Sequence, residues 1–203
     1  MPVRRTGDWE VARRALAGGG RRLGRALRQA VQVEAQRLRA DIVVGFRTQA
    51  PGGQRFRPLS ALTLASRRMR GRDASGRFTG GGFRGNKALV RTGDLRSSIS
   101  VIQRGDVAFV GVPKAVGPGR LRVAEVHEFG SDPIIIPITP KMRRFLAVLF
   151  KRAGRSRPVG NRAGSGVVVT QIPARPFLRP AFEQWKKGVD RRTIGTIRKR
   201  MGW

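Results

Sequence analysis

Apolar residues recur at every third or fourth position between residues 21 and 46, and arginines and other polar residues lie between them. The recurring residues are Leu23, Leu27, Ala30, Val31, Leu38, Ile42, Val43 and Phe46. This spacing places them on one side of an α-helix. We therefore predict a helix over residues 21–46 that ends near Pro51-Gly52-Gly53.

A shorter helical segment precedes this helix. Residues 8–17 suit a helix whose first turn is capped by Asp8. Three glycines follow, Gly18 to Gly20, and glycine loses more backbone entropy in a helix than any other residue. We therefore predict a break at these glycines and a flexible N-terminal arm over residues 1–20.

Two runs of alternating apolar residues, 97–103 and 107–112, flank the triplet Arg104-Gly105-Asp106. Alternation with a short glycine-containing connection is typical of an antiparallel hairpin. The corner before the hairpin contains Thr92, Gly93, Asp94 and Leu95. Thr92 and Asp94 can cap a tight turn, Gly93 tolerates a positive φ, and Leu95 can enter the core. We predict that this corner fixes the register of the hairpin.

The rest of the pattern predicts short helices and strands. We expect helices after Ser60, over residues 121–129 and 140–150, and after Pro176, with strands over 133–138 and 166–172. The predicted fold class is α+β, with a long N-terminal helix packed on a small, mostly antiparallel sheet, additional helices, extended loops and an arm. One domain is expected over residues 21–190, with loop insertions at about 71–86 and 151–165 and a basic C-terminal tail over 191–203.

The formal net charge of the 203-residue chain is +31, from 43 basic and 12 acidic residues. Self-repulsion on this scale indicates a polyanionic or acidic partner. Of the basic residues 36 are arginine, which favours bidentate contacts to phosphate or carboxylate, although a GC-rich genome also raises arginine content. The predicted contacts to DNA or to an acidic protein are Arg67, Arg68, Arg70, Arg72, Arg77 and Arg84.

The side chains that usually carry catalysis are scarce. The chain has no cysteine, no tyrosine and one histidine, His127. His127 and Glu128 are adjacent on a predicted helix and so point in different directions. We predict no catalytic residue, no cofactor and no metal site. No apolar stretch approaches the length of a membrane span, so we expect a protein that assembles in the cytoplasm without a membrane.

Four segments occur in an order that resembles the tail-completion, or virion-morphogenesis, family of Mu-like and lambda-like tailed phages. They are "RFRPLSALTLASRR", "LVRTGDLRSSISV", "AEVHEFG" and "IPARPFLRPAF". The residues that match the family pattern most closely are Thr92, Gly93, Leu95, His127, Glu128, Phe129, Gly130, Pro173, Arg175, Pro176 and Phe177. The chain departs from the pattern at Val123-Ala124, where the family usually has Tyr-Ala.

The resemblance implies a structural protein of the virion that acts at the head–tail junction. It implies a homo-oligomeric ring, expected to be hexameric, whose partners are portal-side head–tail adaptor proteins and the tail terminator or tail tube. Double-stranded DNA in the channel is a further expected contact. Arg175 is then available to a carboxylate of its own chain or of a neighbour. The alternative function is a basic protein that binds or packs DNA without sequence specificity.

Overall fold

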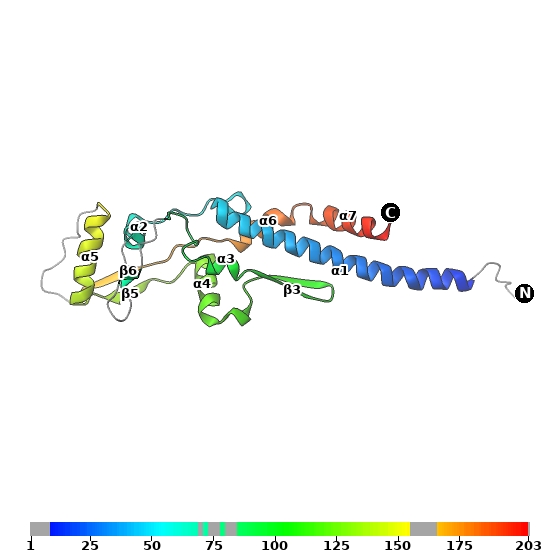
Figure 1. Ribbon diagram of the computed structural model, residues 1–203, viewed down its shortest axis with the longest axis horizontal. Coiled ribbons are helices and arrows are strands. Elements are labelled where there is room, and N and C mark those ends of the chain that lie inside the picture. Colours follow the sequence, from blue (N-terminus) through cyan, green and yellow to red (C-terminus); the bar gives the residue numbers. More distant parts are fainter. Residues whose placement is uncertain (1–8, 69–70, 73–77, 80–84, 155–165, 203) are drawn as a thin grey trace, which may run out of the picture.

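The computed structural model describes residues 9–68, 71–72, 78–79, 85–154 and 166–202. The molecule is elongated, and its long axis follows one helix (Figure 1). This helix, α1 (Trp9–Thr48), contains 40 residues and is therefore about 60 Å long at about 1.5 Å per residue. Its N-terminal turns project beyond the other elements.

The predicted break at Gly18–Gly20 is wrong, because α1 passes through all three glycines. The expected arm over residues 1–20 is therefore helical from Trp9 onward, and residues 1–8 lie outside the described residues. A break would create two new helix ends and require a second, costly nucleation. The helix-favouring Ala, Leu and Arg residues around the glycines offset their penalty of about 1 kcal/mol each.

The core lies on the C-terminal half of α1. That half packs against η1 (Pro51–Gly53), α6 (Leu178–Lys186) and the hairpin β3 (Ser100–Arg104) and β4 (Val107–Gly111). The buried cluster comprises Leu38, Ile42, Phe46, Leu95, Ile99, Val112, Ala124, Phe177 and Ala181. At its centre the rings of Phe46 and Phe177 lie 5.0 Å apart between centroids.

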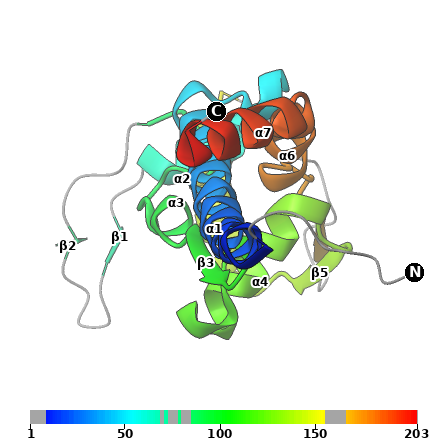
Figure 2. The same ribbon diagram turned by 90° about the vertical axis from the view of Figure 1, so that its right-hand side faces the viewer.

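The C-terminal residues form a helix and not the predicted basic tail. Helix α7 (Val189–Met201) runs back along α1 on the side opposite the β3–β4 hairpin (Figures 1 and 2). A buried ion pair holds the two helices together, because Arg192 Nη2 lies 3.0 Å from Glu34 Oε2 and Glu34 is almost fully buried. Arg192 also donates to the carbonyl oxygen of Trp185 at 2.7 Å. A buried carboxylate needs such a partner, and Arg192 supplies it.

The α+β class is confirmed, and the strands within the described residues form three separate antiparallel pairs. The predicted β3–β4 hairpin is present, with Ile102 opposite Phe109 and Gly105 in the turn at φ 62°. A second pair joins β5 (Ile134–Pro137) to β6 (Val167–Thr170). The third, β1 (Gly71–Arg72) with β2 (Phe78–Thr79), falls within the predicted insertion at 71–86.

Short helices complete the fold. Helix α2 (Ala61–Arg68) begins as predicted after Ser60, whose hydroxyl accepts the N–H of Thr63 at 3.2 Å. Helix α4 (Pro118–Phe129) ends at Gly130, and η2 (Lys114–Val116) precedes it. Helix α5 (Pro140–Arg152) extends two residues into the predicted insertion at 151–165, and residues 155–165 lie outside the described part of the chain.

Candidate functional site: a basic groove where the four motifs meet

Glu128 joins the end of α4 to the beginning of α6. Its carboxylate is buried and accepts the backbone N–H groups of Phe177 and Leu178 on Oε2, at 2.8 and 3.0 Å, and that of Arg179 on Oε1 at 2.8 Å. The first N–H groups of a helix have no partner within the helix, and they carry its positive dipole end. Glu128 therefore satisfies the N-terminus of α6 both by hydrogen bonds and by charge.

Backbone hydrogen bonds also connect two of the motif segments, residues 124–130 and 172–182, at or next to their ends. The N–H of Arg175 donates to the carbonyl oxygen of His127 at 2.7 Å, and the N–H of Ser131 donates to that of Ile172 at 3.0 Å. Gly130 lies between these bonds with φ 89°, a conformation that favours glycine. The two motifs, more than forty residues apart in sequence, thus form one rigid junction, and the buried ring of Phe177 anchors it in the core.

The corner at residues 92–95 lies in the same region, but its connection to the hairpin differs from the prediction. Gly93 has φ 84°, the N–H of Asp94 donates to Thr92 Oγ1 at 3.5 Å, and Leu95 is buried in the core, as expected. The chain does not enter the hairpin directly, however, because a helical turn, α3 (Asp94–Ser97), comes first. The corner leads into this turn, and the hairpin begins at Ser100.

Arg175 connects this junction to the remaining motif segment, residues 55–68. Its Nε donates to the carbonyl oxygen of Arg57 at 2.9 Å and its Nη2 to that of Pro58 at 3.3 Å. The side chain is buried. Of the two alternatives expected for Arg175, a carboxylate of its own chain or of a neighbour, the first is absent among the described residues, where backbone carbonyls take its place. Burial lowers the pKa of Arg175, and the positive charges of Arg57 and Arg67 lower it further. Two of its N–H groups thus donate to backbone carbonyl oxygens, and no ion pair of Arg175 is formed within the described residues.

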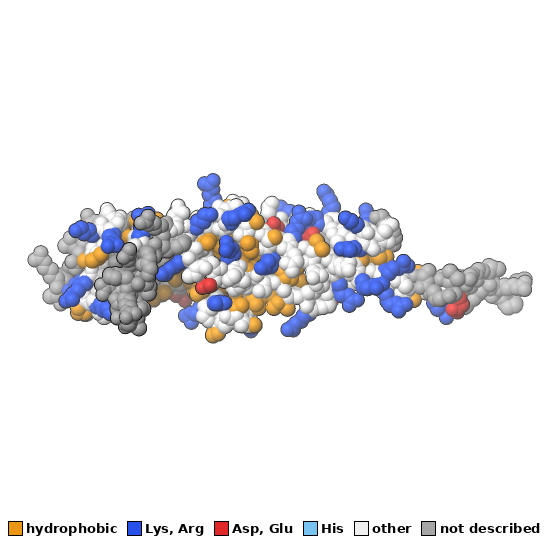
Figure 3. Space-filling model, in the orientation of Figure 1, with side chains coloured by type: hydrophobic (Ala, Val, Ile, Leu, Met, Phe, Trp, Pro, Cys, Tyr) orange, Lys and Arg blue, Asp and Glu red, His pale blue; other side chains and the backbone are white. Residues whose placement is uncertain are grey.

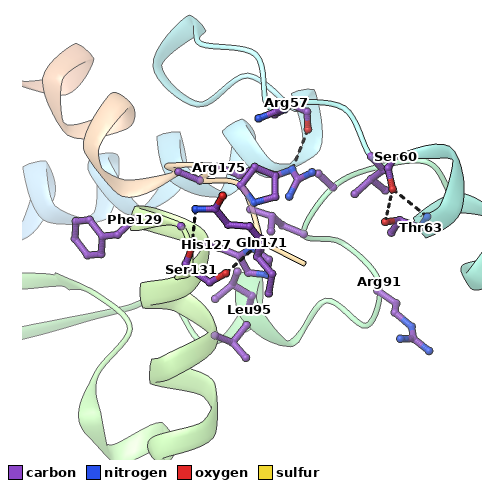
Figure 4. Close-up of a pocket in the computed structure, with 18 of the residues that line it drawn as sticks. Arg57, Ser60, Thr63, Arg91, Leu95, His127, Phe129, Ser131, Gln171 and Arg175 are labelled. Carbon is purple, nitrogen blue, oxygen red and sulfur yellow. Dashed lines mark hydrogen bonds between the residues drawn. The ribbon is translucent and has the colours of Figure 1, made fainter. Parts of the chain in front are cut away.

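An open groove with a volume of about 1660 Å³ lies at this meeting point, and all four motif segments line it. Its basic residues are Arg57, Arg67, Arg91, Arg120 and Arg175, and its acidic residues are Asp94 and Asp132. In Figure 4, His127, Ser131, Gln171 and Arg175 lie close together, while the ring of Phe129 points away from them. Burial and the charge of Arg91 lower the pKa of Arg67. The groove is therefore electropositive.

His127 contributes a buried nitrogen to this groove. Its Nδ1 has no hydrogen-bond partner among the described residues. Burial lowers the pKa of His127, and the positive charge of Arg175 lowers it further, so the imidazole is neutral near pH 7. Its neighbour Glu128 is fully engaged with α6, and a histidine–carboxylate pair does not form between them.

The six arginines predicted to contact DNA or an acidic partner do not form one site. Arg67 lines the groove and donates to the carbonyl oxygen of Lys87 at 2.8 Å. Arg68 is exposed at the end of α2, and Arg72 belongs to β1. The other three, Arg70, Arg77 and Arg84, lie outside the described residues.

The roles of two acids, Glu34 and Glu128, were not predicted from the sequence, although Glu128 was among the residues that match the family pattern. Glu34 lies four residues after Ala30 and four before Leu38, so an acid in the apolar stripe of α1 was a visible signal for a buried ion pair. Glu128 gave no such signal, because α6 begins 50 residues further along the chain.

Comparisons with protein-family models, with curated proteins and with solved structures find no match to this chain. Across the described ranges, three or more His, Asp or Glu side chains never gather in an arrangement that could hold a metal ion. None of the described helices combines the length and the apolar character needed to cross a membrane.

Proposed function

We propose that this chain is a structural virion protein of a tailed phage, a tail-completion or head–tail joining component that acts as a homo-oligomer. The observation that carries the proposal is the convergence of the four resembling segments on one junction and one groove. Segments scattered between residues 55 and 182 share a single three-dimensional location, which supports treating them as one functional unit. Their hydrogen bonds are those of a scaffold, which favours a role without catalysis.

Exposed apolar side chains support assembly with neighbouring subunits. Phe129 is 80% exposed, and one face of the β5–β6 pair presents Ile135 at 67% and Val169 at 62%. Apolar residues gathered on a surface usually mark an interface. A ring in which each copy covers such surfaces of the next, and which we expect to be hexameric, accounts for this exposure.

The proposal is tested by mutating the gene for this chain in the phage that carries it and examining the particles. A stop codon in the gene should produce filled heads and free tails that fail to join, and a silent change at the same codon should leave joining intact. Cryo-electron microscopy of intact particles should place the chain at the neck. Joined, infectious particles that lack the chain would contradict the proposal.

The second candidate is a protein that binds DNA without sequence specificity. Lys and Arg side chains are spread over the face seen in Figure 3, where acidic side chains are few. The end of α7 adds Arg198, Lys199 and Arg200. This function predicts that the purified chain retains duplex DNA at physiological salt, with an affinity that falls steeply as salt rises. Retention on DNA together with absence from particles would favour this candidate over the first.

A further inference from the structure

Arg175 is a buried cation that has no carboxylate partner among the described residues. Its side chain is 7% exposed, and both of its recorded hydrogen bonds go to neutral carbonyl oxygens. A buried guanidinium without a counter-charge is costly, and buried charges in proteins are normally paired with an opposite charge. The neighbouring Arg57 and Arg67 add further positive charge to the same place. Within the described part of the chain, no carboxylate pairs with Arg175.

The shape and lining of the groove restrict the kind of anion. Its volume of about 1660 Å³ exceeds the roughly 300–1,000 Å³ of ordinary small-molecule pockets. Apolar side chains, Leu89, Leu95, Val123 and Ile172, line it together with the arginines. Ser60 and Thr63 add hydroxyl groups at the beginning of α2. An extended peptide with both carboxylate and apolar side chains fits such a surface.

We propose that this groove binds an extended acidic segment of a partner protein, with a carboxylate of that segment approaching the cluster of Arg57, Arg175 and His127. This inference rests on the proposed function in one respect, because it names the chemistry by which the chain would bind its neighbour in the particle. The carboxylate supplies the missing counter-charge of Arg175. The apolar residues of the segment cover the apolar lining.

Duplex DNA fits the groove less well. Arg175 lines the groove but is only 7% exposed, so an aspartate or glutamate side chain approaches it more closely than the phosphates of a duplex do. Phosphates of a duplex are fixed to a wide backbone, and they contact exposed arginines more readily than buried ones. The apolar lining offers nothing to a phosphate backbone.

His127 provides a built-in reporter of this binding. It is the single histidine of the chain, so its imidazole NMR signals are assigned without ambiguity. Its pKa is held low by burial and by Arg175. A carboxylate bound beside Arg175 offsets that positive charge and should raise the pKa of His127.

The experiment uses the full chain and a short fluorescein-labelled peptide that alternates pairs of glutamates with leucines. A peptide with every glutamate replaced by glutamine is the control ligand. The groove variant is Arg57→Gln with Arg91→Gln, and both of these side chains are exposed, so the fold should persist. The matched control, Arg96→Gln with Arg104→Gln, removes the same charge from exposed residues outside the groove.

We expect the glutamate peptide to bind, the glutamine peptide not to bind, and the groove variant to raise the dissociation constant about tenfold or more. The matched control should change it less than about threefold, since it alters only long-range attraction. The glutamate peptide should also shift the titration of His127 to higher pH.

Three results would overturn the inference. They are no binding of the glutamate peptide, equal weakening by the two variants, and displacement of the peptide by a duplex DNA that shifts His127 to the same extent. The last result would assign the groove to phosphate. None of these results concerns the location of the chain in particles, so failure here and failure of the tail-completion proposal can be told apart.

Discussion

The two halves of α1 differ in what covers their apolar residues. In the C-terminal half, Ala30, Ile42 and Phe46 are at most 1% exposed beneath the hairpin, α6 and α7. In the N-terminal half, Leu16 is 77% exposed and Leu23 is 46% exposed. Both halves belong to one unbroken helix. The same kind of residue therefore contributes strongly to stability at one end of the helix and little at the other.

The glycines of α1 show the same contrast. A Cβ atom built on Gly19 meets nothing within 4 Å, whereas one built on Gly45 would lie 2.6 Å from the Cα of Pro51. Gly45 is therefore required by the close approach of η1, and Gly19 is tolerated without a packing role. The identity of the residue alone does not distinguish these two cases.

The largest effect should come from the buried ring at the centre of the core. Phe46→Ala is expected to lower the free energy of unfolding by about 3–5 kcal/mol, because it removes buried surface and leaves a cavity. Leu16→Ala on the same helix should change it by less than about 0.5 kcal/mol. Denaturant-induced unfolding of both variants measures the difference. Similar values would mean that the exposed half of α1 is covered in solution.

The junction at Glu128 should give the next largest effect. Glu128→Ala leaves three N–H groups of α6 without their acceptor and should cost about 2–3 kcal/mol of unfolding free energy. Glu128→Gln keeps one oxygen acceptor and should cost less. Glu125→Ala, an exposed position one turn earlier on α4, is the control and should be near neutral. A loss for Glu125→Ala as large as for Glu128→Ala would contradict the capping role.

The paired glycine substitutions test the comparison most directly. Gly45→Ala should destabilise the protein by about 1–3 kcal/mol through the clash with Pro51. Gly19→Ala should stabilise the projecting turns of α1 by about 1 kcal/mol, because alanine favours the helix and no neighbour obstructs it. Amide hydrogen exchange of α1 follows both changes. Slower exchange around residue 19 only in the Gly19→Ala variant is the expected pattern.

The smallest effect concerns the pH dependence from His127. Its folded-state pKa lies below the ordinary value of 6.5, so the unfolded chain takes up a proton first as the pH falls. The contribution of His127 to unfolding free energy is therefore zero well above pH 6.5 and becomes increasingly destabilising below it, down to the folded-state pKa. In His127→Gln this part of the acid-induced decline should disappear. Parallel pH profiles for the two proteins would show that His127 does not take part.

The elements that the sequence predicted correctly are those set by local patterns. Alternation around Arg104-Gly105-Asp106 predicted β3 and β4. Ser60 correctly predicted the beginning of α2, and Gly130 the end of α4. Gly93 and Leu95 were placed correctly because turn geometry and apolar character are local properties. The break at Gly18–Gly20 was wrong, since the penalty of three glycines was weighed without the cost of two new helix ends.

By itself, the amino-acid sequence determined the α+β class, the presence of the β3–β4 hairpin and the excess of positive charge, because these depend on spacing and composition. Only the tertiary structure decided that residues 191–201 form a helix on α1, that Glu128 caps α6, and that Arg175 is buried against backbone carbonyls. These outcomes depend on which segments pack together across 50 residues or more of chain. The partners of Glu128 and Arg175 are therefore set by the packing of distant segments and not by the residues next to them in the sequence.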